Sequence, residues 1–265
     1  NEGMPFSRKK PEIQGGLSGT ALKYIAMTTM LADHIGAVLL ERIVYYRGNL
    51  EQVAMLMTSQ WGDTLYWLWR MLRTVGRIAF PIYCFLLVEG FLHTRDWRRY
   101  WLRMAAFALI SEIPFRLAVW NTWAGGSSNV YVELAIGLLV LRGLKQSEGL
   151  TQPRRAAGMA AVIGGGCLAA VFLKADYDMD GILIISLFYL LREKRIVQVM
   201  SGGILSLLES WNMCYGAGIL SAVPLYFYNG KKGQAPWKYA FYWFYPLHLM
   251  VLFFIRLYVV GIPLG

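Results

Sequence analysis

The sequence LSGTALKYIAMTTMLADHIGAVLL, residues 17–40, decides the fold class of this chain. A helix needs about 20 apolar residues to cross the hydrocarbon core of a bilayer, and this stretch is longer than that. It nevertheless contains Lys23, Asp33 and His34. A charged side chain inside a bilayer costs roughly 3 kcal/mol or more, so such residues are usually functional. We predict a membrane-spanning helix that contributes polar groups to a site within the membrane.

The composition extends this pattern to the whole chain. Hydrophobic residues make up 57% of the 265 residues and charged residues 16%, whereas soluble domains are about 25% charged. The mean hydropathy is +0.42. These values exclude an intrinsically disordered chain. They also argue against a soluble two-domain enzyme, because most of the long segments lack the polar face of a soluble helix.

We therefore predict an all-α fold, a polytopic transmembrane helix bundle of about nine to ten spans, several of them short or broken. A cytoplasmic tail (1–16) precedes a single membrane domain (17–265). The stretch 42–69 mixes charged and apolar residues and has room for one further interfacial helix. The predicted spans are 17–40, 75–91 (beginning as early as Trp61), 101–119, 130–141, 156–173, 181–191, 196–208, 216–228 and 239–260.

The net charge of +10 resides largely in short loops between these spans. Basic clusters follow the second, fourth, sixth and eighth spans, whereas the loops 120–129, 174–180 and 209–215 are neutral or acidic. Positively charged loops stay on the cytoplasmic side, so we predict an inner (plasma) membrane protein with a cytoplasmic N-terminus and an external C-terminus. The lipid bilayer explains the basic residues, and we expect no nucleic-acid partner. These residues are Arg95, Arg98, Arg99, Arg103, Arg142, Lys145, Arg154, Arg155, Arg192, Lys194, Arg195, Lys231, Lys232 and Lys238.

The first two spans supply the candidate catalytic residues. Lys23 and His34 are eleven residues apart, almost three helical turns, so they share one face about 16 Å apart along the axis. Asp33 points about 100° away from His34 and should meet a neighbouring helix. Arg77 lies at a similar depth in the second span, where a guanidinium can hold a carboxylate or a developing oxyanion. The structural alternatives are an Asp33–Arg77 ion pair, a snorkelling Lys23 and a structural His34.

Other polar residues near the outer ends of the spans are candidates for binding the acceptor. Glu112 and Arg116 flank Pro114 and can pair on one helical face, which gives them a mainly structural interpretation. The three cysteines lack zinc-ligand spacing and the aspartates near 178 lack the calcium-loop glycine and glutamate, so we expect no metal. The remaining acceptor-site candidates are Glu133, Asp178, Asp180 and Asn212.

The last span contains FYWFYPLH, residues 241–248. Pro246 predicts a kink, and Tyr245 and His248 flank it. An imidazole one turn beyond a kink fits a functional role and a structural role equally well.

Four motifs in sequence order resemble the TraX family, which is related to the F-pilin acetylase. They are LKYIAM with Met30 and DHIG (22–36), RIAFP with EGF and Thr94 (77–94), the region 178–181, and FYWFYPLH (241–248). Together they cover about residues 17–252. The basic residue eleven positions before a histidine is also similar to the first helix of acyltransferase-3 membrane enzymes, which have Arg where this chain has Lys23.

The resemblance implies a membrane acetyltransferase that uses acetyl-CoA as co-substrate. The best-known member of the TraX family acetylates the N-terminus of a pilin subunit. We expect His34 to act as general base, with Asp33 or Arg77 positioning groups or stabilising the oxyanion. The sequence leaves the acceptor open among a pilin or other exported peptide, a glycan hydroxyl and a lipid headgroup. An ion-coupled small-molecule transporter and a non-catalytic membrane scaffold are the alternatives, since broken spans and buried charges also mark carriers. The coenzyme-binding candidates are Lys23, Arg95, Arg99, Tyr245 and His248.

Overall fold

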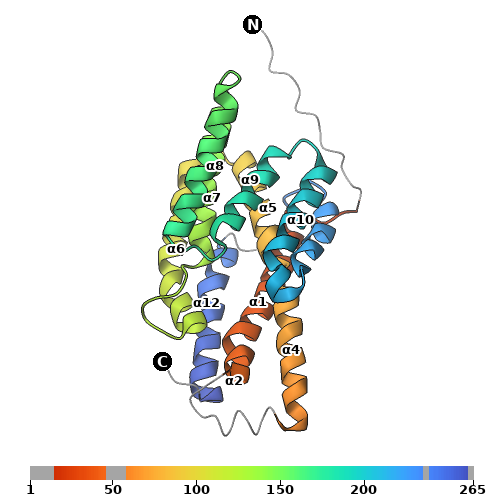
Figure 1. Ribbon diagram of the computed structural model, residues 1–265, viewed down its shortest axis with the longest axis vertical. Coiled ribbons are helices and arrows are strands. Elements are labelled where there is room, and N and C mark those ends of the chain that lie inside the picture. Colours follow the sequence, from red (N-terminus) through yellow and green to blue (C-terminus); the bar gives the residue numbers. More distant parts are fainter. Residues whose placement is uncertain (1–14, 46–57, 235–238, 262–265) are drawn as a thin grey trace.

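The computed structural model describes residues 15–45, 58–234 and 239–261, and over these residues the fold is a bundle of helices (Figure 1). The α-helices are α1 (Gly19–Ile35), α2 (Glu41–Tyr45), α4 (Gln60–Gly76), α5 (Ala79–His93), α6 (Trp97–Phe115), α7 (Val130–Ser147), α8 (Arg154–Phe172), α9 (Asp178–Leu190), α10 (Arg195–Cys214), α11 (Ala222–Tyr226) and α12 (Ala240–Phe254). Shorter segments are the π-helices η1 (Gly36–Leu40), η2 (Arg116–Trp120) and η4 (Ile255–Val260) and the 3₁₀-helix η3 (Ala217–Ser221).

The all-α prediction is confirmed, and each predicted span has a helical counterpart among these elements. Several spans are composite, because α1 continues into η1, α6 into η2 and α12 into η4. Three of the described helical segments are long and apolar enough to cross a membrane: Gln60–His93, Arg154–Phe172 and Ala240–Val259. Most of the predicted tail (1–14), part of the stretch 42–69 (46–57) and the loop around Lys238 (235–238) lie outside the described residues.

Two prolines each remove one hydrogen bond from a helix. Pro81 has no N–H for the carbonyl of Arg77, so α4 ends at Gly76 and α5 begins at Ala79 after a two-residue turn. Pro246 likewise leaves the carbonyl of Tyr242 without its helical donor. The hydroxyl of Tyr131 donates a hydrogen bond of 3.1 Å to that oxygen, which satisfies it inside the bundle.

Helix α5 forms the centre of the bundle and contacts α1, α7, α9 and α10. Ile82, Phe85 and Val88 are fully buried, as expected for a helix that is apolar on all sides. Helix α8 is also apolar but lies at the periphery (Figure 1), and Phe172 is 86% exposed. This combination is typical of a helix whose outer face contacts lipid.

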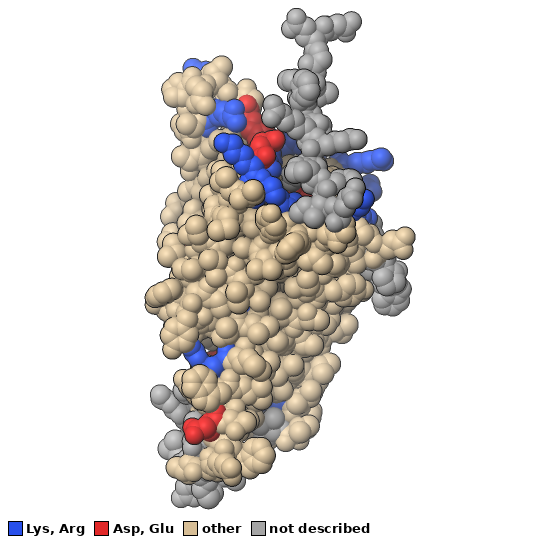
Figure 2. All heavy atoms as spheres, turned by 90° about the vertical axis from the view of Figure 1, so that its right-hand side faces the viewer, with Lys and Arg blue, Asp and Glu red and all other residues tan. Residues whose placement is uncertain are grey.

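The charged side chains gather toward the ends of the molecule. On the face shown in Figure 2, Lys, Arg, Asp and Glu concentrate near one end, a few lie toward the other end, and the band between them is uncharged. The loops that join α7 to α8 and α9 to α10 lie at the first end (Figure 1), which we call the basic end. The arrangement matches a bundle whose waist sits in the hydrocarbon core.

Arg256, in η4, forms hydrogen bonds with η2. Its fully buried guanidinium donates to the carbonyls of Leu117 and Ala118 at 2.9 and 2.7 Å and to Oδ1 of Asn121 at 2.6 Å. These acceptors lie at the end of a helical segment, where carbonyls lack intrahelical partners. One buried arginine therefore holds η2 against η4, the segment that continues α12.

Gly76 yields a test of the packing between α1 and α4. A Cβ at this position would overlap the side chain of Asp33. We expect Gly76→Ala to lower the free energy of unfolding by about 1–3 kcal/mol, because α1 and α4 must move apart. Thermal unfolding of the purified protein in detergent measures this change.

Gly164→Ala is the matched control, since nothing lies within 4 Å of the position that a Cβ would take there in the middle of α8. We expect it to be neutral or stabilising by about 0.5–1 kcal/mol. Equal melting temperatures for the two variants would contradict the close approach of α1 and α4.

Candidate active site

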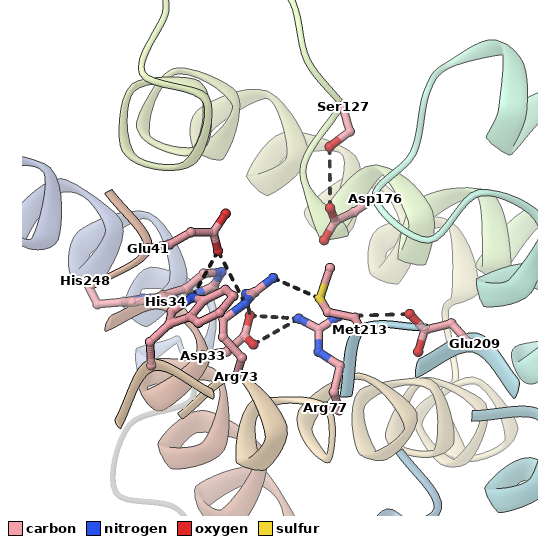
Figure 3. Close-up of polar contacts among 11 residues, drawn as sticks. Asp33, His34, Glu41, Arg73, Arg77, Ser127, Asp176, Glu209, Met213 and His248 are labelled. Atoms are coloured by element: carbon pink, nitrogen blue, oxygen red, sulfur yellow. Dashed lines mark hydrogen bonds and ion pairs between the residues drawn. The ribbon is translucent and has the colours of Figure 1, made fainter. Parts of the chain in front are cut away.

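A buried carboxylate with two arginines occupies the contact between α1 and α4. Arg73 Nη1 donates to Asp33 Oδ2 at 2.7 Å, and Arg77 Nη2 donates to Oδ1 and Oδ2 at 2.9 and 3.1 Å (Figure 3). All three side chains are 10–13% exposed. We call this group the Asp33 clamp. Such charge-assisted hydrogen bonds are the strong ones, and they compensate for the removal of three charges from water.

The local sequence explains how the clamp forms. Arg73 and Arg77 are four residues apart, so both project from the same face at the end of α4. Gly76 lets Asp33 approach the backbone between them. The Asp33–Arg77 pairing is the structural alternative that the sequence suggested, and the structure shows this pairing. Arg77 also lies 4.0 Å from Glu209 on α10.

His34 and His248 form a direct contact between α1 and α12. His34 Nδ1 lies 2.7 Å from His248 Nε2, and His248 Nδ1 lies 2.6 Å from the carbonyl oxygen of Phe244. Both histidines are 8% exposed. The His248 ring stacks on Phe244, with 4.7 Å between ring centres, and Tyr245 meets the His34 ring edge to face. The pair is thus held on two sides by aromatic rings.

A cavity of about 680 Å³ adjoins both groups. His34, Asp33, Arg73 and Arg77 lie in its wall, and Met30, Phe80, Tyr83 and Tyr245 supply apolar and aromatic surface. The rest of the polar lining comes from elements away from the basic end: Glu41, Arg42, Ser127, Lys174, Asp176, Asp178 and Glu209. This volume is in the range of small-molecule pockets, and it combines apolar walls with a few convergent charges.

The cavity brings together only part of the predicted site. His34, Asp33, Arg77, Tyr245 and Asp178 line it, and His248 reaches it through His34. The predicted orientation of Asp33 toward a neighbouring helix is confirmed by its ion pairs with α4.

The other predicted site residues lie elsewhere, and their roles stay predictions. Near the basic end, the ammonium of Lys23 sits 5.0 Å from the centre of the Phe241 ring, and Arg95 and Arg99 are exposed around the start of α6. The predicted acceptor-site residues other than Asp178 do not line the cavity. Arg116 pairs with Glu112 at 2.8 Å, and Glu133 is fully buried against Gly181. Asp180 is half-buried and Asn212 is exposed.

Arg73 is the principal site residue that the sequence patterns did not single out. Its signal was present, because it lies one helical turn before Arg77 and so shares a helical face with it. Glu41 was also missed. It lines the cavity, lies 3.7 Å from Arg73 and accepts a hydrogen bond from the indole of Trp69 at 3.3 Å.

Comparison with known proteins identifies the family of this chain. The family described as TraX protein matches residues 18–256. The chain belongs to the TraX family. One relative is the probable fimbrial assembly protein FimC, serogroup H1, of Dichelobacter nodosus, which is 29% identical over 236 residues, covering 77% of this chain and 88% of the relative. No solved structure matches the chain. Family and helices together identify a membrane protein, as the sequence predicted.

The Asp33 clamp makes a testable contribution to the stability of this TraX protein. Asp33→Asn removes the charge that compensates Arg73 and Arg77, and breaking a buried pair in this way costs about 3–5 kcal/mol. We expect a clear fall in the thermal unfolding temperature in detergent.

Asp96→Asn is the control for this substitution. Asp96 also binds an arginine, Arg99, at 3.1 Å, but the two side chains are 48% and 82% exposed. Exposed pairs contribute about 0–1 kcal/mol, so this variant should melt close to the wild type. Similar melting temperatures for Asp33→Asn and Asp96→Asn would mean that the clamp does not stabilise the bundle.

Proposed function

We propose that this TraX-family protein is a membrane-embedded acetyltransferase that moves the acetyl group of acetyl-CoA to an amine or hydroxyl of an exported acceptor. The observation that carries the proposal is the position of His34. Its imidazole is 8% exposed and lines a large polar cavity within an apolar helix bundle. A titratable ring in such a place fits a general base better than a packing residue.

The reaction follows from these groups. His34 takes the proton of the acceptor amine or hydroxyl as its nitrogen or oxygen attacks the thioester carbonyl. The tetrahedral intermediate then collapses, the carbon–sulfur bond breaks, and the proton passes from His34 to the departing coenzyme A thiolate. The guanidinium groups of Arg73 and Arg77 place positive charge in the cavity wall, where it can stabilise the transient oxyanion.

The two substrates require access from opposite sides. Part of the polar lining of the cavity comes from the 120–129 and 174–180 loops and from Glu209 of α10, away from the basic end, so we propose that the acceptor enters there. Acetyl-CoA is cytoplasmic and anionic, and the basic end suits its phosphates. Arg95, Arg99 and Lys23 are our candidates for holding the coenzyme, with its thioester directed along α1 and α12 toward His34.

The acceptor that we favour is the N-terminus of a pilin-like or other exported peptide. The relative from Dichelobacter nodosus carries the name of a probable fimbrial assembly protein, and the family resemblance points the same way. The carboxylates of Glu41, Asp176, Asp178 and Glu209 in the cavity wall suit an approaching amine.

Transfer of radiolabel from acetyl-CoA to a short peptide with a free N-terminal amine tests the proposal, with an N-terminally blocked peptide as the negative substrate. General bases contribute about 10²–10⁴-fold, so we expect His34→Gln to reduce the rate by that factor. Wild-type rates in folded His34→Gln protein would contradict the assignment. Solute uptake into proteoliposomes without any acetyl transfer would favour a transporter.

His93→Gln is the matched control. His93 lies at the last turn of α5, where its Nδ1 is 2.8 Å from the carbonyl oxygen of Glu89, and it is not among the residues that line the cavity. We expect this variant to keep the wild-type rate.

A further inference from the structure

The contact between His34 and His248 specifies where the ring protons lie. The oxygen of Phe244 is a carbonyl and can only accept, so the proton of His248 sits on Nδ1, 2.6 Å from that oxygen. His248 is surrounded by the rings of Phe244, Tyr245 and His34, and no ion pair with a carboxylate is formed by His248 within the described part of the chain. Apolar surroundings favour the neutral ring. A neutral ring protonated at Nδ1 carries its lone pair on Nε2.

The same reasoning then fixes His34. Its Nδ1 lies 2.7 Å from the lone pair of His248 Nε2, so Nδ1 of His34 must be the donor. A neutral His34 is therefore unprotonated at Nε2, which makes no hydrogen bond with any described residue and belongs to a ring that lines the cavity. Nδ1 of His34 thus donates to Nε2 of His248, and Nδ1 of His248 donates to the backbone carbonyl of Phe244 in α12.

We propose that His248 is the positioning residue of this site, which holds His34 in the Nδ1–H tautomer so that Nε2 is the atom that takes the proton of the acceptor. This inference rests on the proposed function for its chemistry, but the tautomers follow from the geometry alone. It gives His248 a task other than coenzyme binding, because both of its ring nitrogens are already engaged. A carboxylate performs the equivalent task in serine hydrolases, where loss of the correct tautomer is costly.

The chain is well suited to a direct test, because it has three histidines. Nitrogen-15 NMR of protein labelled at histidine distinguishes a protonated ring nitrogen from a bare one. We expect wild-type His34 and His248 both to be protonated at Nδ1 and bare at Nε2. Variants in which one histidine at a time is replaced assign the signals. The Nδ1 of His93 also faces a carbonyl oxygen, so His93 supplies a reference for this tautomer. A His34 ring protonated at Nε2 in the wild type would overturn the proposal.

Two substitutions of His248 test the consequence for catalysis. His248→Phe keeps the stacking on Phe244 but has no acceptor for His34 Nδ1, whereas His248→Gln places an amide oxygen near the former Nε2. Hydrogen-bond partners that orient a metal-bound histidine typically contribute 10–100-fold to activity, and we take the same range for the partner of His34. We expect kcat to fall by about 10- to 100-fold in His248→Phe, with the KM for acetyl-CoA unchanged, and we expect His248→Gln to recover part of this loss.

The outcomes distinguish a failure of this inference about His248 from a failure of the proposed acetyltransferase function. Equal losses in the two variants, or a large rise in the KM for acetyl-CoA, would show that His248 does not act by positioning His34. If the wild type transfers no acetyl group at all, the proposed function fails, but the NMR measurement still decides whether His248 fixes the tautomer of His34.

Discussion

The ion pairs of Asp33 with Arg73 and Arg77 fix α1 against α4, and the placement of the other site residues depends on that contact. A single buried carboxylate in an apolar bundle would be costly, and so would two buried guanidinium groups. Asp33 neutralises one of the two guanidinium charges, and Glu41 and Glu209 lie 3.7 and 4.0 Å from Arg73 and Arg77. The ion pairs hold the two helices so close that there is no room for a Cβ at position 76. His34 follows Asp33 directly in α1, so the same contact sets the depth and the direction of its ring.

The second contact, between His34 and His248, joins α1 to α12. The backbone carbonyl of Phe244 orients His248, which follows Pro246 by two residues inside α12, and Arg256 anchors the far end of the same helical segment to η2. Two polar contacts of α1, one toward α4 and one toward α12, thus lie beside the cavity. The polar groups of the site restrain one another, which is what a pre-organised reaction centre requires.

Much of the fold could be predicted from the sequence, because span length and apolar character are local properties. The predicted second span ran through Arg77 and so missed the two-residue turn between α4 and α5, and α12 continues as a helix through Pro246. Asp33 could be predicted to meet another helix from helical geometry alone. The partnership of His34 with His248 could not, since it joins residues 214 positions apart and depends on how α1 packs against α12. Arg73 was missed for a different reason: the predicted second span was drawn from residue 75, which left Arg73 outside it, whereas α4 contains Arg73.

A structure of the protein with a non-reactive analogue of acetyl-CoA tests the central claim most directly. We expect the carbonyl carbon of the analogue to reach the cavity close to His34, so that an acceptor atom could lie about 3 Å from both that carbon and Nε2. A coenzyme bound with its thioester on the lipid-facing side of α8, or confined to the basic end with closed helices between it and His34, would contradict the assignment of His34 as the base.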